Sequence, residues 1–147
     1  MTRQMQSQET EARVDLKPAH SNTGSVDGAW WPRSRDLATE VPTLIKSLAG
    51  RLSPTARLVY HLPSWDTAPR RFETGGRNVK LDGYRFQPIN TVYVVGTDRD
   101  RLVLLVVPPG TEPADAQSMM SSASTADNES TPSQLLELDH SARSTAN

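Results

Sequence analysis

Apolar side chains are concentrated in the middle of this 147-residue chain. Residues 27–111 hold 23 of the 29 Leu, Ile, Val and Phe residues, and all eight aromatic residues lie between Trp30 and Tyr93. Because a segment folds only where it can bury enough apolar surface, this distribution limits where a core can form. We therefore expect three regions: a disordered N-terminus over 1–11, a single domain over 12–120, and a disordered, acidic, Ser/Thr-rich tail over 121–147.

The formal net charge of −1 conceals an uneven distribution of charge. Residues 27–111 carry a charge of +4, whereas residues 112–147 carry −5. A mildly basic domain is therefore expected to carry an acidic tail. That tail either keeps its part of the chain in solution or folds back over a basic surface and competes with an anionic partner. The tail also contains three leucines that are either residual apolar residues or a short docking segment: Leu135, Leu136 and Leu138.

Composition excludes several kinds of site. The chain has no cysteine, so it has no disulfide, no thiolate zinc site, no iron–sulfur cluster and no cysteine nucleophile. Its three histidines, His20, His61 and His140, are far apart in the sequence, and we expect neither a metal nor a cofactor. The first residues lack the apolar stretch of a signal peptide, and no apolar run approaches the roughly 18 residues of a membrane span. A cytoplasmic location is expected.

An amphipathic helix is predicted over Arg35–Ala49. Ser34 is a suitable N-cap, because its hydroxyl can accept a hydrogen bond from the first turn, and Gly50 suits the left-handed residue that often ends a helix. The apolar residues recur at helical spacing: Leu37, Val41, Leu44, Ile45 and Leu48. They form one stripe, which predicts that a single face of the helix packs against the rest of the domain.

The segments on either side of this helix alternate between apolar and polar residues, as β-strands do. Single strands are predicted over Arg13–Lys17 and Arg57–Leu62. Two hairpins are predicted as well: Arg71–Thr74 with Asn78–Leu81 around Gly75–Gly76, and Thr91–Val95 with Arg101–Val107 around a short polar connection.

Strands joined by such short connections are antiparallel neighbours. The predicted fold class is α+β, with an antiparallel sheet of about five or six strands packed on one main amphipathic helix in two layers. A tight turn is expected at Asp27–Gly28, and a short helix at 112–120.

No catalytic motif is present, and the candidate site residues are aromatic side chains with arginines nearby. A first group, in DGAWWPRSRD, comprises Trp30, Trp31, Arg33 and Arg35, and a second comprises Trp65, Asp66, Arg70 and Arg71. A third, weaker group is Tyr84–Arg85–Phe86. Aromatic and guanidinium groups together can hold a flat or phosphorylated ligand by stacking and paired hydrogen bonds. The alternative is that the tryptophans are core residues and the arginines are solvated or paired with Asp27, Asp36, Asp66 and Asp82.

Two adjacent tryptophans in an extended segment point to opposite faces. We therefore expect one of Trp30 and Trp31 to enter the core and the other to face outward.

Four segments carry a resemblance to a known family. They are DGAWWPRSRDL, TARLVYHLPSWDTAPRR, a GG(R)xVxLxGYR hairpin and LxLLVVPP. Over roughly residues 12–120 the chain resembles a family of small actinobacterial proteins, a domain of unknown function marked by a DGAWWPRS motif. The resemblance implies an actinobacterial, soluble, single-domain protein, and it implies no activity.

Three classes of function fit these observations. The first is a non-catalytic binding or interaction module whose partner is a protein or a small anionic ligand. The second is a small enzyme that uses Asp27, Asp66 or Asp82 as acid or base beside an anion held by arginine, which requires two of these carboxylates to meet in one pocket. The third is weak nucleic-acid binding, which a charge of +4 over 85 residues does not favour.

Overall fold

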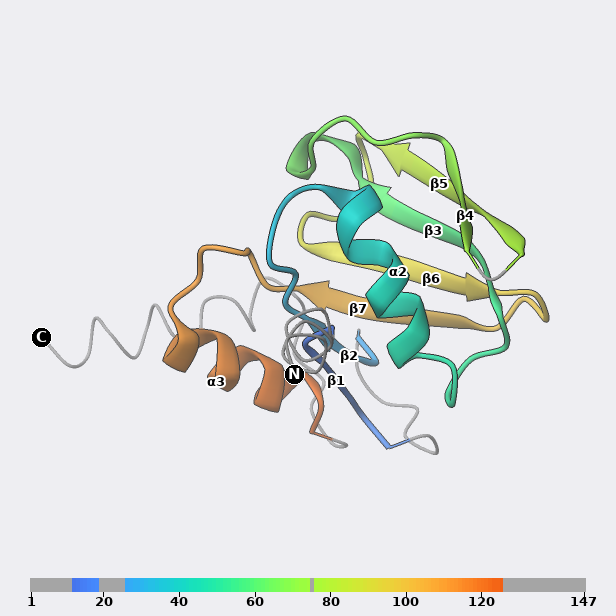
Figure 1. Cartoon of the computed structure of the whole chain (residues 1–147). Coiled ribbons are helices and arrows are strands. Elements are labelled where there is room, and N and C mark those ends of the chain that lie inside the picture. The colour runs from blue at the N-terminus through green and yellow to red at the C-terminus, as the bar shows by residue number, and fades with distance from the viewer. Residues whose placement is uncertain (1–11, 19–25, 75, 126–147) are drawn as a thin grey trace, which may run out of the picture.

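The computed structural model describes residues 12–18, 26–74 and 76–125. The expected disorder at 1–11, most of the tail expected to be disordered over 121–147, and the three tail leucines lie outside these residues; within the described part, residues 121–123 are helical rather than disordered. The elements, in chain order, are β1 (Val14–Leu16), β2 (Gly28–Trp30), α2 (Leu37–Ser47), β3 (Thr55–His61), the short 3-10 helix η1 (Leu62–Ser64), β4 (Arg71–Thr74), β5 (Arg77–Tyr84), β6 (Thr91–Gly96), β7 (Arg101–Val106) and α3 (Pro113–Ala123). Figure 1 shows their arrangement.

The described strands form one seven-stranded sheet in the order β1-β2-β7-β6-β3-β5-β4. The prediction of an α+β fold is confirmed, but an all-antiparallel sheet of five or six strands is wrong, because β2 pairs with β7 and β3 with β5 in parallel. Short connections reveal antiparallel neighbours only. A parallel pair joins segments that are not consecutive strands, so the hairpin signals could not show it.

Strand β2 is absent from the sequence prediction. It begins at Gly28, so the tight turn expected at Asp27–Gly28 is wrong, and its three residues are buried. A strand this short, with no polar face, shows no alternation. Both predicted hairpins are confirmed as β4–β5 and β6–β7.

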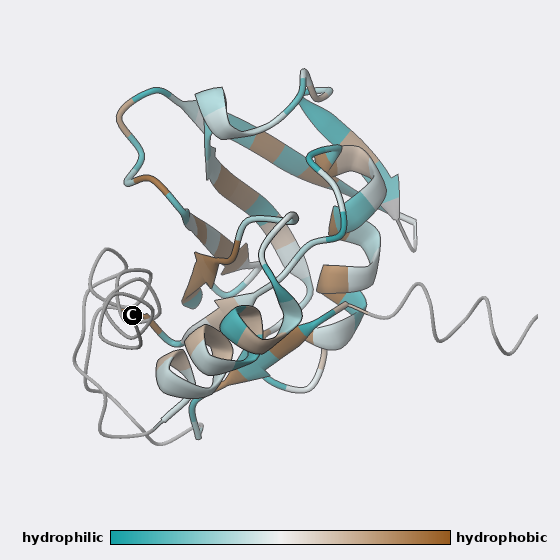
Figure 2. Ribbon diagram, turned by 90° about the vertical axis from the view of Figure 1, so that its left-hand side faces the viewer, coloured by the Kyte–Doolittle hydropathy of each residue, from teal (hydrophilic) through white to brown (hydrophobic). Residues whose placement is uncertain are grey.

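Helix α2 lies over one face of the sheet (Figure 1). Its stripe is confirmed, because Leu37, Val41, Leu44 and Leu48 are at most 1% exposed. Burying each of these side chains contributes about 1.5–3 kcal/mol. They pack in one cluster with Leu58 and with residues of β5, β6 and β7. Figure 2 shows that the most hydrophobic segments lie in the strands of the sheet.

The predicted ends of this helix are wrong. The N-cap residue is Asp36 rather than Ser34, whose hydroxyl donates to the Glu40 carboxylate at 2.8 Å, and the C-cap is Leu48, with φ −93°, rather than Gly50. The end of the next predicted strand also differs, because Leu62 lies in η1 and is 38% exposed.

A second helix covers part of the opposite face, so the two-layer prediction is wrong. The short helix expected at 112–120 is confirmed as α3, which contacts β1 and β2. Its Met119 and Met120 join a second core cluster with Ala29, Trp31 and Leu105. Odd-numbered residues of β7 therefore face α3 while even-numbered ones face α2.

Gly28 allows β1 to approach β2 closely. A Cβ atom at this position would lie 2.2 Å from the Asp15 carbonyl oxygen and 2.8 Å from the Leu16 Cα, and neither backbone atom can move without separating the two strands. We expect Gly28→Ala to lower the free energy of unfolding by about 1–3 kcal/mol, measured by urea denaturation.

Gly50→Ala is the matched control, because a Cβ there meets no atom within 4 Å. Its free energy of unfolding should be unchanged or slightly raised, by up to about 1 kcal/mol. Equal losses in the two variants would contradict the steric explanation.

Candidate functional site

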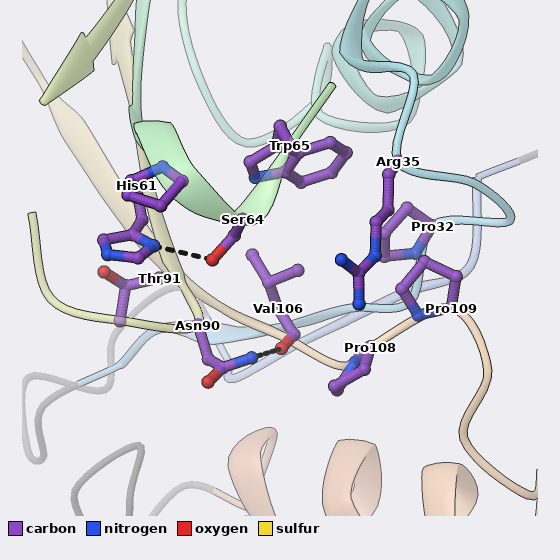
Figure 3. A pocket seen from close by; sticks show the side chains of 11 residues that line it. Pro32, Arg35, His61, Ser64, Trp65, Asn90, Thr91, Val106, Pro108 and Pro109 are labelled. Carbon is purple, nitrogen blue, oxygen red and sulfur yellow. Dashed lines mark hydrogen bonds between the residues drawn. The ribbon is translucent and has the colours of Figure 1, made fainter. Parts of the chain in front are cut away.

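A cavity of about 210 Å³ lies where the ends of several strands meet the segment before α2. Figure 3 shows the side chains that line it. They come from four parts of the chain: Pro32 and Arg35 before α2; His61, Pro63, Ser64 and Trp65 around η1; Asn90 and Thr91 at the start of β6; and Val106, Pro108 and Pro109 at the end of β7. The cavity therefore exists only after distant segments have assembled.

Two of the tryptophans predicted as site residues stack on each other behind this cavity. The ring centroids of Trp30 and Trp65 are 5.4 Å apart, with an angle of 20° between the ring planes. Trp30 is 1% exposed and belongs to the α2 core, so it anchors Trp65 at the cavity wall. The main chain joins the same two segments, because the Asp66 N–H donates to the Arg35 carbonyl at 3.0 Å.

Two charged side chains hold the Trp31–Arg35 segment. Glu40 is 8% exposed, and its two carboxylate oxygens accept from the Arg33 N–H at 3.1 Å and from the Ser34 hydroxyl at 2.8 Å. Arg13 donates to the Trp31 and Pro32 carbonyls at 2.9 and 3.1 Å. Burial lowers the pKa of Arg13. Hydrogen bonds to charged groups are stronger than neutral ones, so this wall of the cavity is well fixed.

Most polar groups lining the cavity already have partners. The His61 Nδ1 and Ser64 Oγ atoms are 2.6 Å apart, and the Thr91 hydroxyl donates to the Pro88 carbonyl at 2.7 Å. Asn90 adopts φ 64°, a left-handed conformation that Asn tolerates, and its side-chain amide donates to the Val106 carbonyl at 3.3 Å. These bonds position the lining without using an external ligand.

Arg35 differs from its neighbours in the cavity. Its guanidinium makes no hydrogen bond and no ion pair with any described residue, and Figure 3 shows it directed into the space between Trp65, Val106 and the prolines. A guanidinium is always charged and presents donors in a planar fork that matches a carboxylate or phosphate. The arrangement can therefore bind an anion.

The other predicted site residues lie elsewhere. The expectation that one tryptophan faces outward is wrong: Trp31 is 6% exposed, because α3 covers it on the opposite face from Trp30. Its indole N–H donates to the Pro109 carbonyl at 3.4 Å, and Arg13 lies 3.6 Å over its ring. The cavity lining does not include Arg33, Asp66, Arg70 or Arg71, which are all exposed.

Sequence reasoning missed four polar lining residues: His61, Ser64, Asn90 and Thr91. No local signal marks them as a site, because they come from the ends of β3 and β6 and gather only when these strands pair.

The carboxylates proposed for catalysis do not meet. Asp27 accepts from the Val103 N–H at 2.7 Å, beside β2, while Asp82 on β5 pairs with Arg57. Strands β7, β6 and β3 lie between them, and neither they nor Asp66 line the cavity. The arrangement gives no support to a pair of acid and base carboxylates. Over the described ranges, no group of three or more His, Asp and Glu residues could hold a metal ion.

One family model matches residues 13–123. The chain belongs to DUF5994, a family of unknown function. The match runs from Arg13 to Ala123, so the DUF5994 unit includes both core clusters and the entire cavity lining. No curated protein and no solved structure matches the chain. In the part of this DUF5994 protein that the structure describes, no helix has the length and apolar character needed to cross a membrane.

Glu40 provides a test of how the cavity wall is held. In Glu40→Ala, the Arg33 N–H and the Ser34 hydroxyl lose their acceptor in a partly buried place, so we expect the free energy of unfolding to fall by about 1–3 kcal/mol in urea denaturation. Ser47→Ala, at an exposed position of the same helix, should change it by less than about 0.5 kcal/mol. If both variants changed the free energy of unfolding by a similar amount, Glu40 would not be what holds the Trp31–Arg35 segment.

Proposed function

We propose that the protein is a non-catalytic binding module that holds a small anionic ligand in the cavity beside Arg35 and Trp65. The observation that carries this proposal is the Arg35 guanidinium, which points into the cavity and has no partner among the described residues. Arg35 is exposed, so its charge is hydrated in the free protein, and an anionic ligand in the cavity would exchange that water for a charge-assisted hydrogen bond beside the Trp65 ring.

The rest of the lining indicates what kind of anion fits. Trp65 and the prolines Pro63, Pro108 and Pro109 form the apolar part of a lining that is otherwise polar, and this part suits a flat hydrocarbon or aromatic group. The volume, about 210 Å³, lies below the roughly 300–1,000 Å³ of sites for drug-sized ligands. We therefore propose a ligand with one anionic group on Arg35 and a small planar body against Trp65.

Benzoate is a suitable probe for this site, because it combines a carboxylate with a planar ring. Titration of the full chain, followed by NMR, should shift the Trp65 indole N–H signal and the amide signals of Ser64 and Asn90. Arg35→Gln should weaken benzoate binding by about tenfold or more, since a hydrogen bond to a charged group is worth about 1.5–3 kcal/mol.

Arg70→Gln is the matched control, because Arg70 is an exposed arginine outside the cavity lining. It should bind benzoate like the original chain. Benzyl alcohol, which has the same ring without the charge, should bind at least about tenfold more weakly than benzoate. Equal binding of the two compounds, shifts confined to residues away from the cavity, or no binding at millimolar benzoate would each overturn the proposal.

We further propose that DGAWWPRS marks the family, that the chain is actinobacterial, and that it works in the cytoplasm. Support for the motif is that its residues have separate structural tasks: Trp30 and Trp31 enter the two cores, while Ser34 binds Glu40. The absence of cysteine suits a reducing compartment, where disulfides do not form.

A further inference from the structure

The face of the sheet that carries α3 is only partly covered by it. The α3 cluster includes residues of β2 and β7 but none of β6, β3, β5 or β4. Over these four strands, no helix of the described ranges packs on this face, whereas α2 covers the opposite face. We call this part, the face of β6, β3, β5 and β4 turned away from α2, the open face of the sheet.

Strand register gathers four cations into one row on this open face. Arg101 on β7 is paired with Val95 on β6, which is paired with Arg57 on β3. Arg57 is paired in turn with Lys80 on β5, and Lys80 with Arg71 on β4. Since neighbouring strands are about 4.8 Å apart, the row spans about 19 Å.

All four side chains of this cationic row point away from the α2 core. Side chains alternate along a strand, and the neighbours of the row, Leu58, Val79, Leu81 and Leu102, belong to the α2 cluster. Arg71, Lys80 and Arg101 are exposed, and the Arg57 side chain is 42% exposed.

Arg57, Lys80 and Arg71 are adjacent members of the row, and their like charges face one another across strands. Such pairs destabilise a sheet, because their Cβ atoms are only about 4.5–5.5 Å apart. Asp82 compensates Arg57 through an ion pair, and its hydrogen bond raises the pKa of Arg57, whereas Lys80 and Arg71 form no ion pair with any described residue. An anion lying along the row would relieve this repulsion.

Two aromatic side chains, those of Tyr93 and Tyr84, lie near the cationic row, and a third, Phe86, lies farther away, beyond the end of β5. Tyr93 is in the next row of the same face, and Arg101 lies 4.7 Å from its ring centroid. Tyr84 is 48% exposed, and its hydroxyl accepts from Arg57 at 3.1 Å. Phe86, just beyond the end of β5, is 97% exposed. A large apolar ring so fully in water has no structural task in the described fold.

We propose that the open face of the sheet binds single-stranded nucleic acid, with the sugar-phosphate backbone across the cationic row, one base against Tyr84 and a further base against Phe86, where the bound strand continues past the end of β5. Proteins that bind single strands combine a positively charged track with aromatic rings on which bases stack. An acidic peptide would match the cations but would leave the exposed rings without a stacking partner. This site is separate from the cavity of Arg35.

Net charge alone does not favour nucleic-acid binding by this domain. A charge averaged over 85 residues contains no information about which cations share a row. Register brings together four basic residues that are distributed from 57 to 101 in the sequence.

Fluorescence anisotropy of a labelled oligothymidylate of about 12 nucleotides tests the proposal with the full chain. Binding should weaken with salt, with a slope of log affinity against log salt of about −2.1 for three phosphate contacts on a single strand, because Asp82 already neutralises Arg57. Lys80→Gln and Arg71→Gln should each weaken binding about fivefold at 0.1 M salt and reduce the steepness of that slope by about 0.7.

Lys46→Gln is the matched control, because it removes one exposed positive charge from α2, on the covered face. It should leave affinity and slope unchanged. Phe86→Ser should lower affinity several-fold without changing the slope, since it removes stacking and no charge. All these positions are exposed, so the variants should fold, which circular dichroism would verify.

Several results would overturn the nucleic-acid site. The first is that the chain does not bind the oligonucleotide at low salt. The second is that Lys46→Gln and Lys80→Gln lose the same amount of affinity for it. The third is that polyglutamate binds as tightly as the oligonucleotide and that Phe86→Ser does not change the affinity. The last result would indicate an acidic protein partner instead. Arg35→Gln should bind the oligonucleotide normally, so this test and the benzoate test fail independently.

Discussion

The adjacent residues Trp30 and Trp31 connect the two sides of the molecule. They lie at the end of one three-residue strand, and alternation sends Trp30 into the α2 core and Trp31 into the α3 core. Stacking on Trp30 holds Trp65, and the Trp31 indole binds Pro109, so both tryptophans also position walls of the cavity. The position of the candidate site therefore depends on two neighbouring side chains, neither of which lines the cavity.

Local patterns in the sequence predicted those elements whose partners are near in the chain. The stripe of α2 and both hairpins follow from periodicity and turn residues, because these signals are contained within about 15 residues. What could not be predicted involves distant partners. The parallel pairs β2–β7 and β3–β5 have no connecting turn, and the burial of Trp31 depends on a helix more than 80 positions later. A helix cap at Ser34 is a sound local inference that fails because the helix begins at Leu37, while the Ser34 hydroxyl donates to Glu40 and accepts from the Asp36 N–H.

The candidate site shows the same limit. Arg35 and Trp65 were identified in two separate groups of aromatic and basic residues, but nothing local indicated that these groups meet. His61, Ser64, Asn90 and Thr91 carry no recognisable motif, and the cationic row is visible only after the strands are aligned. Composition cannot reveal a site that depends on strand register, because net charge does not say which charged residues lie next to each other.

The pairing of β2 with β7 also constrains when the fold can be completed during synthesis of the chain. The hydrogen bond from the Val103 N–H to Asp27 joins residues 76 positions apart, and β7 is the last strand in the sequence. During synthesis, the α2 core lacks its β7 strand and β2 lacks its only partner toward the centre of the sheet until that strand emerges. Non-local pairings of this kind form slowly. The sheet is therefore completed only after nearly the whole domain has been translated, and a nascent chain that stops before residue 101 lacks the strand that both core clusters share.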